Sequence, residues 1–198
     1  MILTLFLSYS FSSFAFFKAA IVVRDVTPKK LLPVSGGIGP SKSVNRVIGK
    51  LTVRALVLED EDTRVAICST DFLGFPGVLC NKVREQVLSI PNENILIGAT
   101  HNHSGSDCYG FPDEEGKSNV DVEYLNSVCE KLASAINQAV DELQPSVVKI
   151  ATGKAQGKIA YNYYAEQLYD PRCHVMQFLN SKGKSIATLV NYAHISRK

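Results

Sequence analysis

The apolar positions of this chain follow helical and extended patterns in turn. The clearest helical pattern covers residues 121–143, where apolar residues recur every three or four positions and line one face. Ser118-Asn119-Val120-Asp121 forms an N-terminal capping pattern before it, and Pro145 lies just beyond its end. A second helical pattern covers residues 78–88 and is ended by Pro91. The first stripe consists of Leu125, Val128, Leu132, Ile136, Ala139 and Leu143.

Extended patterns surround these helices. Residues 51–58 and 64–69 alternate in polarity and are separated by Glu59-Asp60-Glu61-Asp62, so they predict a β-hairpin with a solvated acidic tip. The apolar run at 94–98 predicts a short buried strand. Further strands are expected at 21–23, 147–152, 173–179 and 185–192.

The order of these elements predicts an α/β fold with mixed sheet or sheets and flanking helices. At 198 residues the chain is long enough for one ordinary domain, which we place at 16–198. Residues 29–48 are rich in Gly and Pro and predict a long irregular loop. Such loops are often functional in compact domains, although a plain surface loop is an equal alternative here.

Composition excludes some functions and suggests a compartment. The net charge is +2 and no block of Lys or Arg stands out, so nothing indicates a nucleic-acid surface. Residues 1–15 are predicted to be a signal peptide, with small residues Ser13 and Ala15 at the −3 and −1 positions of a cleavage site. The alternative is an apolar first strand or an imperfect gene start. The signal peptide predicts a secreted, extracellular or membrane-associated protein.

The five cysteines form no Cys-x-x-Cys pair and no zinc-finger pattern. Cys68 and Cys129 fall on apolar faces and are expected in the core. Cys80, Cys108 and Cys173 could pair in an oxidising compartment, and the sequence does not assign partners.

The chemistry-bearing stretch is Ala99-Thr100-His101-Asn102-His103-Ser104-Gly105, directly after the buried strand. Side chains two residues apart on extended backbone point to the same side, so His101 and His103 could bind one cation or flank one reacting group. Two ligands do not complete a zinc site, and a solvated polar turn is the alternative interpretation. Asp71 ends the preceding strand, either as a partner of a metal-binding histidine or as a turn residue.

This stretch resembles the Ala-Thr-His-Thr-His-Ser-Gly signature of the neutral/alkaline, non-lysosomal ceramidases. The resemblance extends from about residue 20 to the C-terminus. It includes Asp25-Val26-Thr27-Pro28, which resembles the Asp-Ile-Thr-Pro that opens the family's catalytic domain, and Leu189-Val190-Asn191-Tyr192-Ala193-His194, which resembles the segment of its second zinc histidine. The resemblance also includes Arg54 to Asp60, Val65 to Asp71, Asp121 to Leu125, Asp170-Pro171 and Val175 to Phe178.

The resemblance implies a role for each matching residue. His101 and His194 would be ligands of Zn²⁺, and His103 would bind or protonate the substrate beside it. Asn162 and Tyr163 stand where relatives carry Asn-Arg at the substrate, so a phenol replaces a fixed charge here. His194 follows Ala193 directly, whereas relatives place one residue between them and a Pro after the His. A terminal residue without a function is therefore the alternative for His194, and a surface histidine is expected at His174.

The function implied is zinc-dependent amide hydrolysis, which cleaves N-acylsphingosine to sphingosine and a fatty acid, with a ceramide-like lipid substrate met at a membrane surface. The family's Gly-Asp-Val-Ser-Pro-Asn segment and its remaining Glu and Tyr ligands would follow Lys198. The resemblance thus predicts an incomplete, N-terminal part of the catalytic domain, without measurable turnover by itself. The alternative is a truncated, non-catalytic remnant that keeps the fold. A weaker option is a hydrolase acting on another amide or ester.

Overall fold

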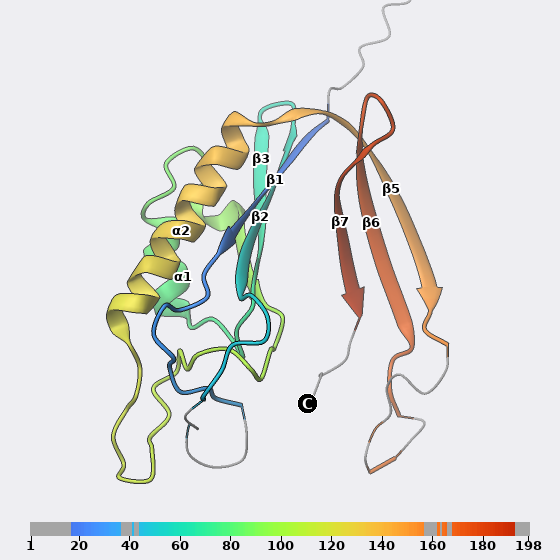
Figure 1. The fold of residues 1–198 in the computed structure, drawn as a ribbon. Coiled ribbons are helices and arrows are strands. Elements are labelled where there is room, and N and C mark those ends of the chain that lie inside the picture. Colours follow the sequence, from blue (N-terminus) through green and yellow to red (C-terminus); the bar gives the residue numbers. More distant parts are fainter. Residues whose placement is uncertain are drawn as a thin grey trace, which may run out of the picture.

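The chain folds into one sheet with helices on one side (Figure 1). The structure is a computed structural model and describes residues 17–36, 41, 44–156, 162, 164, 165 and 168–192. The sheet has seven strands in the order β4-β3-β2-β1-β5-β6-β7, with only β3 and β4 parallel among these pairs. The elements are β1 (Lys18–Asp25), β2 (Thr52–Asp60), β3 (Thr63–Thr70), α1 (Gly77–Arg84), a 3₁₀ turn (Asn92–Asn94), β4 (Ile95–Ala99), α2 (Val122–Asp141), β5 (Gln144–Lys154), β6 (Arg172–Asn180) and β7 (Ser185–Tyr192). The predicted mixed α/β fold is confirmed.

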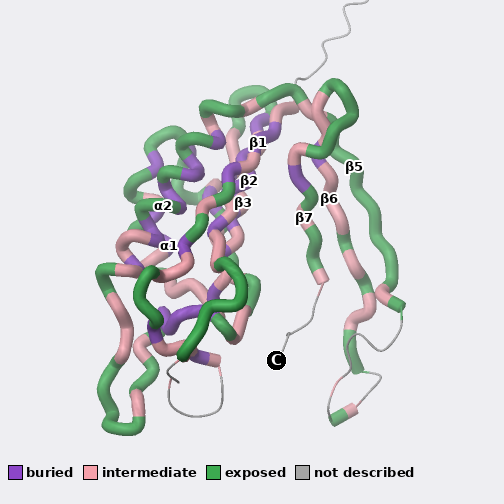
Figure 2. The backbone as a smooth tube through the Cα atoms, viewed as in Figure 1, coloured by how far each residue is buried: buried purple, intermediate pink, exposed green. Residues whose placement is uncertain are grey.

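Helix α2 covers one face of β1 and β2 and supplies most of the main core. Its predicted stripe is buried from Leu125 to Ala139, against Val22, Val53 and Val57 of the sheet. The helix begins at Val122 because Asp121 is the N-cap, and its side chain accepts a hydrogen bond from the Tyr124 N–H at 2.8 Å. Figure 2 shows the buried residues concentrated between these helices and β1–β3.

Helix α1 is shorter than the pattern predicted, because it ends at Arg84 and not near residue 88. The chain then tightens into i→i−3 hydrogen bonds, from Gln86 N–H to Val83 and from Val87 N–H to Arg84. Val87 stays in the core, whereas Leu88 is 94% exposed. The apolar spacing at 87 and 88 therefore reflects the tight turn and not a further helical turn.

Strands β5, β6 and β7 turn away from the rest of the sheet. β1 and β5 pair only through Lys18–Pro145 and Ala19–Gln144, so the two halves separate beyond that point (Figure 1). A small second core lies between them, on the face of β1 and β2 opposite the helices. Its buried members are Ala19, Leu56, Phe178 and Ala187.

The hairpin of β2 and β3 is confirmed, but its acidic tip is narrower than predicted. Glu59 is a strand residue, only 7% exposed, and accepts hydrogen bonds from Lys18 Nζ at 2.7 Å and Arg64 Nε at 2.5 Å. Only Glu61 and Asp62 form the exposed turn. Donation from Lys18 and Arg64 lowers the pKa of Glu59 below its ordinary value of 4.5.

We expect Glu59→Gln to lower the free energy of unfolding by about 1 kcal/mol at pH 7. Because the folded pKa of Glu59 is depressed, its contribution is present above the unfolded value and is lost as the pH falls through the folded one. Urea unfolding at pH 7 and in acid should therefore show the difference from wild type disappearing in acid. Asp62→Asn, at the exposed turn, is the control and should change little. An equal cost for both variants at pH 7 would contradict the pairing.

Several expectations concern the ends of the chain and its thiols. The proposed signal peptide, residues 1–15, lies outside the described residues. None of the described helices is long and apolar enough to cross a membrane. All five cysteines are free thiols, so the pairing considered for Cys80, Cys108 and Cys173 is absent. Cys68 and Cys129 lie in the core as predicted.

Candidate metal and substrate site

The two histidines lie on the loop after β4, and backbone hydrogen bonds join this loop to the segment after β3. Thr100 N–H donates to the Thr70 carbonyl at 2.9 Å, and Asn102 N–H donates to the Phe72 carbonyl at 3.0 Å. Close packing continues at Gly105, where an added Cβ would lie 2.8 Å from the Asp71 carbonyl oxygen. The parallel pairing of β3 and β4 thus continues as backbone contacts beyond both strands and fixes the loop from residue 100 to 105.

His101 is held in an unusual conformation with one ring nitrogen engaged. Its φ is 57°, in the left-handed region that few non-glycine residues adopt. Its Nδ1 lies 2.7 Å from the Leu73 carbonyl oxygen. Because a carbonyl only accepts, Nδ1 carries the proton in the neutral ring, and Nε2 keeps its lone pair. The side chain is exposed at the protein surface, so this lone pair is available to a ligand.

His103 lies beside His101 and is partly buried. The two rings meet edge to face with centroids 4.8 Å apart, so both lie at one place. The backbone between them is not the extended segment that was predicted, because His101 is left-handed. The Nε2 of His103 is buried and has no hydrogen-bond partner in the described structure. Its ring packs on Gly36, where an added Cβ would lie 2.8 Å from Cγ and Nδ1. The described part of the Gly- and Pro-rich loop therefore reaches the histidines.

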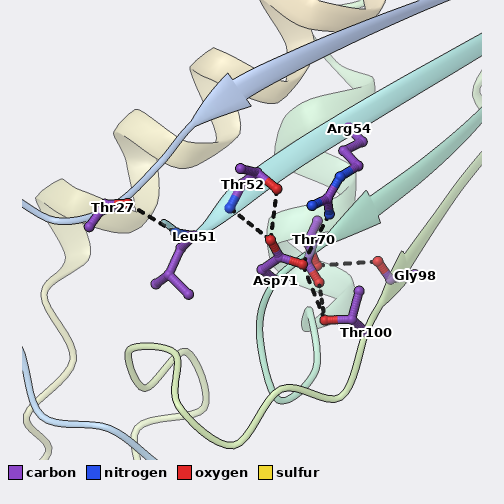
Figure 3. A network of polar contacts seen from close by, with 8 residues as sticks. All are labelled: Thr27, Leu51, Thr52, Arg54, Thr70, Asp71, Gly98 and Thr100. Carbon is purple, nitrogen blue, oxygen red and sulfur yellow. Dashed lines mark hydrogen bonds and ion pairs between the residues drawn. The ribbon is translucent and has the colours of Figure 1, made fainter. Parts of the chain in front are cut away.

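Asp71 does not contact either imidazole. Its Oδ2 accepts from the backbone N–H and the hydroxyl of Thr52 at 2.9 and 2.7 Å, and its Oδ1 accepts from Arg54 Nη1 at 3.1 Å and Thr100 Oγ1 at 3.4 Å (Figure 3). Nearby, Thr70 Oγ1 donates to the Gly98 carbonyl. Asp71 therefore ties β2 to the segment just before His101, which is the turn-residue alternative and not the histidine-partner one.

Of the remaining predicted site residues, only Asn162 lies in the part of the chain that the structure describes. Asn162 is engaged within its own loop, where Oδ1 accepts from Tyr164 N–H at 2.9 Å and Nδ2 donates to the Leu168 carbonyl at 3.2 Å. Tyr163 and His194 lie outside the described residues. His174 is exposed on β6 and pairs across the strands with Thr152 Oγ1 at 3.0 Å, as expected of a surface histidine.

Two contributors to the site were missed from the sequence. The Leu73 carbonyl orients His101, and Gly36 receives the His103 ring. A backbone acceptor leaves no side-chain signal, so nothing in the sequence marked Leu73. Gly36 lies in the loop that the Gly and Pro content did mark, but the pattern gave no partner for it.

The cysteine next to this loop offers no thiolate. Cys108 Sγ donates to the Gly74 carbonyl at 3.0 Å, and burial raises the pKa of its thiol to about 11. A thiol with so high a pKa stays protonated at neutral pH and is a poor nucleophile.

The imidazoles fit part of a zinc site. A histidine that ligates zinc donates its other ring N–H to an acceptor such as a backbone carbonyl, which is the arrangement of His101 and Leu73. The orphaned Nε2 of His103 is a second nitrogen without a protein partner. Within the described ranges, no three His, Cys, Asp or Glu side chains gather closely enough to hold a metal ion. Further ligands would be needed from elsewhere.

Comparison with known proteins gives a likeness in fold. No family model matches the sequence, and no curated protein matches it. Among solved structures, the fold is similar to that of neutral ceramidase from Pseudomonas aeruginosa, with a TM-score of 0.70 and 18% identity over 88% of this chain and 31% of that one. A structure of a ceramidase complexed with C2 gives a TM-score of 0.65 and 18% identity over 88% of this chain and 30% of that one. The chain thus has the fold of less than a third of these enzymes.

Proposed function

We propose that this chain is part of a zinc-dependent amide hydrolase that cleaves N-acylsphingosine to sphingosine and a fatty acid. The observation that carries the proposal is His101, an exposed residue whose Nδ1 is fixed on the Leu73 carbonyl and whose ring meets that of His103. The likeness in fold to ceramidases and the matching His motif support the choice of substrate.

Each side chain has a role in this proposal. His101 would ligate zinc through Nε2, and His194 would be a second ligand. A bound zinc ion would supply a Lewis acid and an activated water for attack on the amide. His103 would form a hydrogen bond with the reacting amide through its orphaned Nε2, and hold or deliver the proton that the leaving amine requires. Asn162 and Tyr163 would contact the substrate.

The setting proposed for this reaction is outside the cell or at a membrane surface. It rests on the apolar residues 1–15 and on the lipid nature of the substrate. A second candidate is a non-catalytic protein that keeps the fold and binds lipid. The observation that favours it is that the described residues bring only two imidazoles together at the site.

The test is to measure zinc content and N-acylsphingosine hydrolysis by the full chain before chelation, after it, and after zinc is returned. We expect zinc to bind and to be removed by the chelator. Hydrolysis that disappears and returns with zinc would support the hydrolase. Because the chain by itself is expected to show no measurable turnover, zinc binding without hydrolysis fits both candidates. Hydrolysis gained when the chain is extended by the family's Gly-Asp-Val-Ser-Pro-Asn segment and remaining zinc ligands would support the hydrolase, and no hydrolysis in that longer chain would support the non-catalytic candidate. A chain that binds no zinc and hydrolyses the amide regardless of chelation would overturn both the metal and the mechanism.

A further inference from the structure

Two neighbouring aromatic rings are exposed on the loop that follows the histidines. Tyr109 is 51% exposed and Phe111 is 43% exposed. Their ring centroids are 5.5 Å apart with an interplanar angle of 39°, so the two rings form one apolar surface. We call this pair the aromatic platform. Single exposed apolar residues are ordinary, but a contiguous pair is a candidate binding surface when it is held rigidly.

The aromatic platform is held rigidly by one buried carboxylate. Asp107 is 3% exposed, and its Oδ1 accepts from the Tyr109 N–H at 2.9 Å while its Oδ2 accepts from the Phe111 N–H at 2.8 Å. Asp107 is itself anchored, because its N–H donates to the Pro33 carbonyl at 3.1 Å. Gly110, between the two aromatics, has a φ of +80°, which a larger residue adopts only with strain. The buried Asp107 side chain therefore fixes the backbone at Tyr109 and Phe111, whose rings are exposed to solvent.

The aromatic platform adjoins the candidate metal site through the segment after β3. The Tyr109 hydroxyl lies against Gly74, where an added Cβ would be 1.9 Å from the hydroxyl oxygen. Leu73, the residue before Gly74, carries the carbonyl that orients His101. Tyr109 thus contacts Gly74, the residue that follows Leu73 in the chain.

The charge around the aromatic platform favours a single neutral lipid over an anionic membrane. The same loop continues through Asp113, Glu114 and Glu115, and Lys117 is the basic residue among them. Lys117 Nζ already pairs with Glu115 at 3.1 Å. Such a rim repels anionic headgroups and leaves an uncharged amide lipid unaffected.

We propose that Tyr109 and Phe111 bind the N-acyl chain of the lipid amide whose head is placed at His101 and His103. This inference rests on the proposed function for the identity of that amide. The flat faces of the rings receive methylene groups, and each buried methylene group favours binding. The aromatic platform therefore determines preference for long chains and takes no part in the bond that breaks.

The test measures binding and not turnover, with the full chain and two fluorescent probes, N-dodecanoyl sphingosine and N-acetyl sphingosine. Tyr109→Ala and Phe111→Ala should each weaken dodecanoyl binding about tenfold and leave acetyl binding within about twofold. Tyr109→Phe keeps the ring and should bind like wild type. Leu88→Ala removes an exposed apolar side chain beyond the end of α1 and should also bind like wild type.

The outcomes separate this inference from the proposed function. Equal dodecanoyl binding by wild type and both alanine variants, or no dodecanoyl binding by wild type, overturns the platform, whatever the result for zinc. Ring-dependent binding of the dodecanoyl probe supports the platform, whether or not the chain shows zinc-dependent hydrolysis. Ring-dependent binding to empty phosphatidylcholine or phosphatidylglycerol vesicles, without binding of the dodecanoyl probe, would make the rings a membrane contact and overturn the inference.

Discussion

Replacement of His101 by asparagine is expected to weaken zinc binding at least about 100-fold, since loss of a mere partner of a ligand already costs about 10- to 100-fold. Asparagine is the informative choice because it tolerates the left-handed backbone that His101 adopts at φ 57°. Alanine would add backbone strain to the loss of the imidazole. With asparagine, the loop should keep its shape, and the change in zinc affinity should report the lost ligand.

Titration calorimetry with zinc, paired with thermal unfolding of each variant, measures this prediction. His174→Asn is the matched control, because His174 is an exposed histidine already paired with Thr152 on the sheet. It should change zinc affinity by no more than about twofold, which is far less than the loss expected when a zinc ligand is removed. Unchanged zinc affinity in the His101 variant, or an equal loss in both variants, would show that the metal is held elsewhere.

The helices and strands were predictable where side chains alternate against one core. The α2 stripe from Leu125 to Ala139 is buried as its period indicated, because a helix lying on a sheet buries the same face along its length. The β2–β3 hairpin was predictable for the same reason. Its tip was misjudged at Glu59, where Lys18 of a distant strand supplies a partner that local composition does not reveal.

The division of the sheet was not predictable from any local pattern. Residues of β5 such as Val147 and Ile150 have the character of buried strand residues, yet they are 61% and 70% exposed. The sequence contains the strands but not the point where β1 and β5 stop pairing. Beyond that point, residues from distant segments, including Leu56 and Phe178, share the small second core, and no local pattern reveals that grouping.

The candidate site was half predictable. The two imidazoles lie together as expected, but the prediction of extended backbone was wrong, because His101 is left-handed with φ 57°. Backbone hydrogen bonds from Thr100 and Asn102 to the segment after β3 fix the loop instead. The sequence offered Asp71 as a partner of a metal-binding histidine, with a turn residue as the alternative. The partner is the Leu73 carbonyl, because the turn after β3 aims a main-chain oxygen at Nδ1. The roles of Tyr163 and His194, which lie outside the described residues, stay predictions.

Substitution of Asp71 by alanine should lower the free energy of unfolding by about 3 kcal/mol. Hydrogen bonds to a charged group are stronger than those between neutral groups, and the substitution leaves every donor to Asp71 without its acceptor. The carboxylate is largely buried, with 14% of the side chain exposed, and accepts four hydrogen bonds from Thr52, Arg54 and Thr100. The substitution removes hydrogen bonds at the start of β2 and at Thr100, the residue before His101. Zinc affinity should therefore fall as well.

Asp170→Ala is the matched control for this loss, since Asp170 also pairs with an arginine but lies at the surface. Arg172 Nη2 is 2.7 Å from Asp170 Oδ2, with 39% of the aspartate side chain exposed, and an exposed pair of this kind contributes little to stability. Urea unfolding should separate the two variants clearly, and zinc titration should show a loss only for Asp71→Ala. Equally small losses of stability in both variants would mean that the hydrogen bonds of Asp71 do not stabilise the strand ends. A loss of stability with unchanged zinc affinity would mean that the hydrogen bonds of Asp71 stabilise the strand ends but do not position His101.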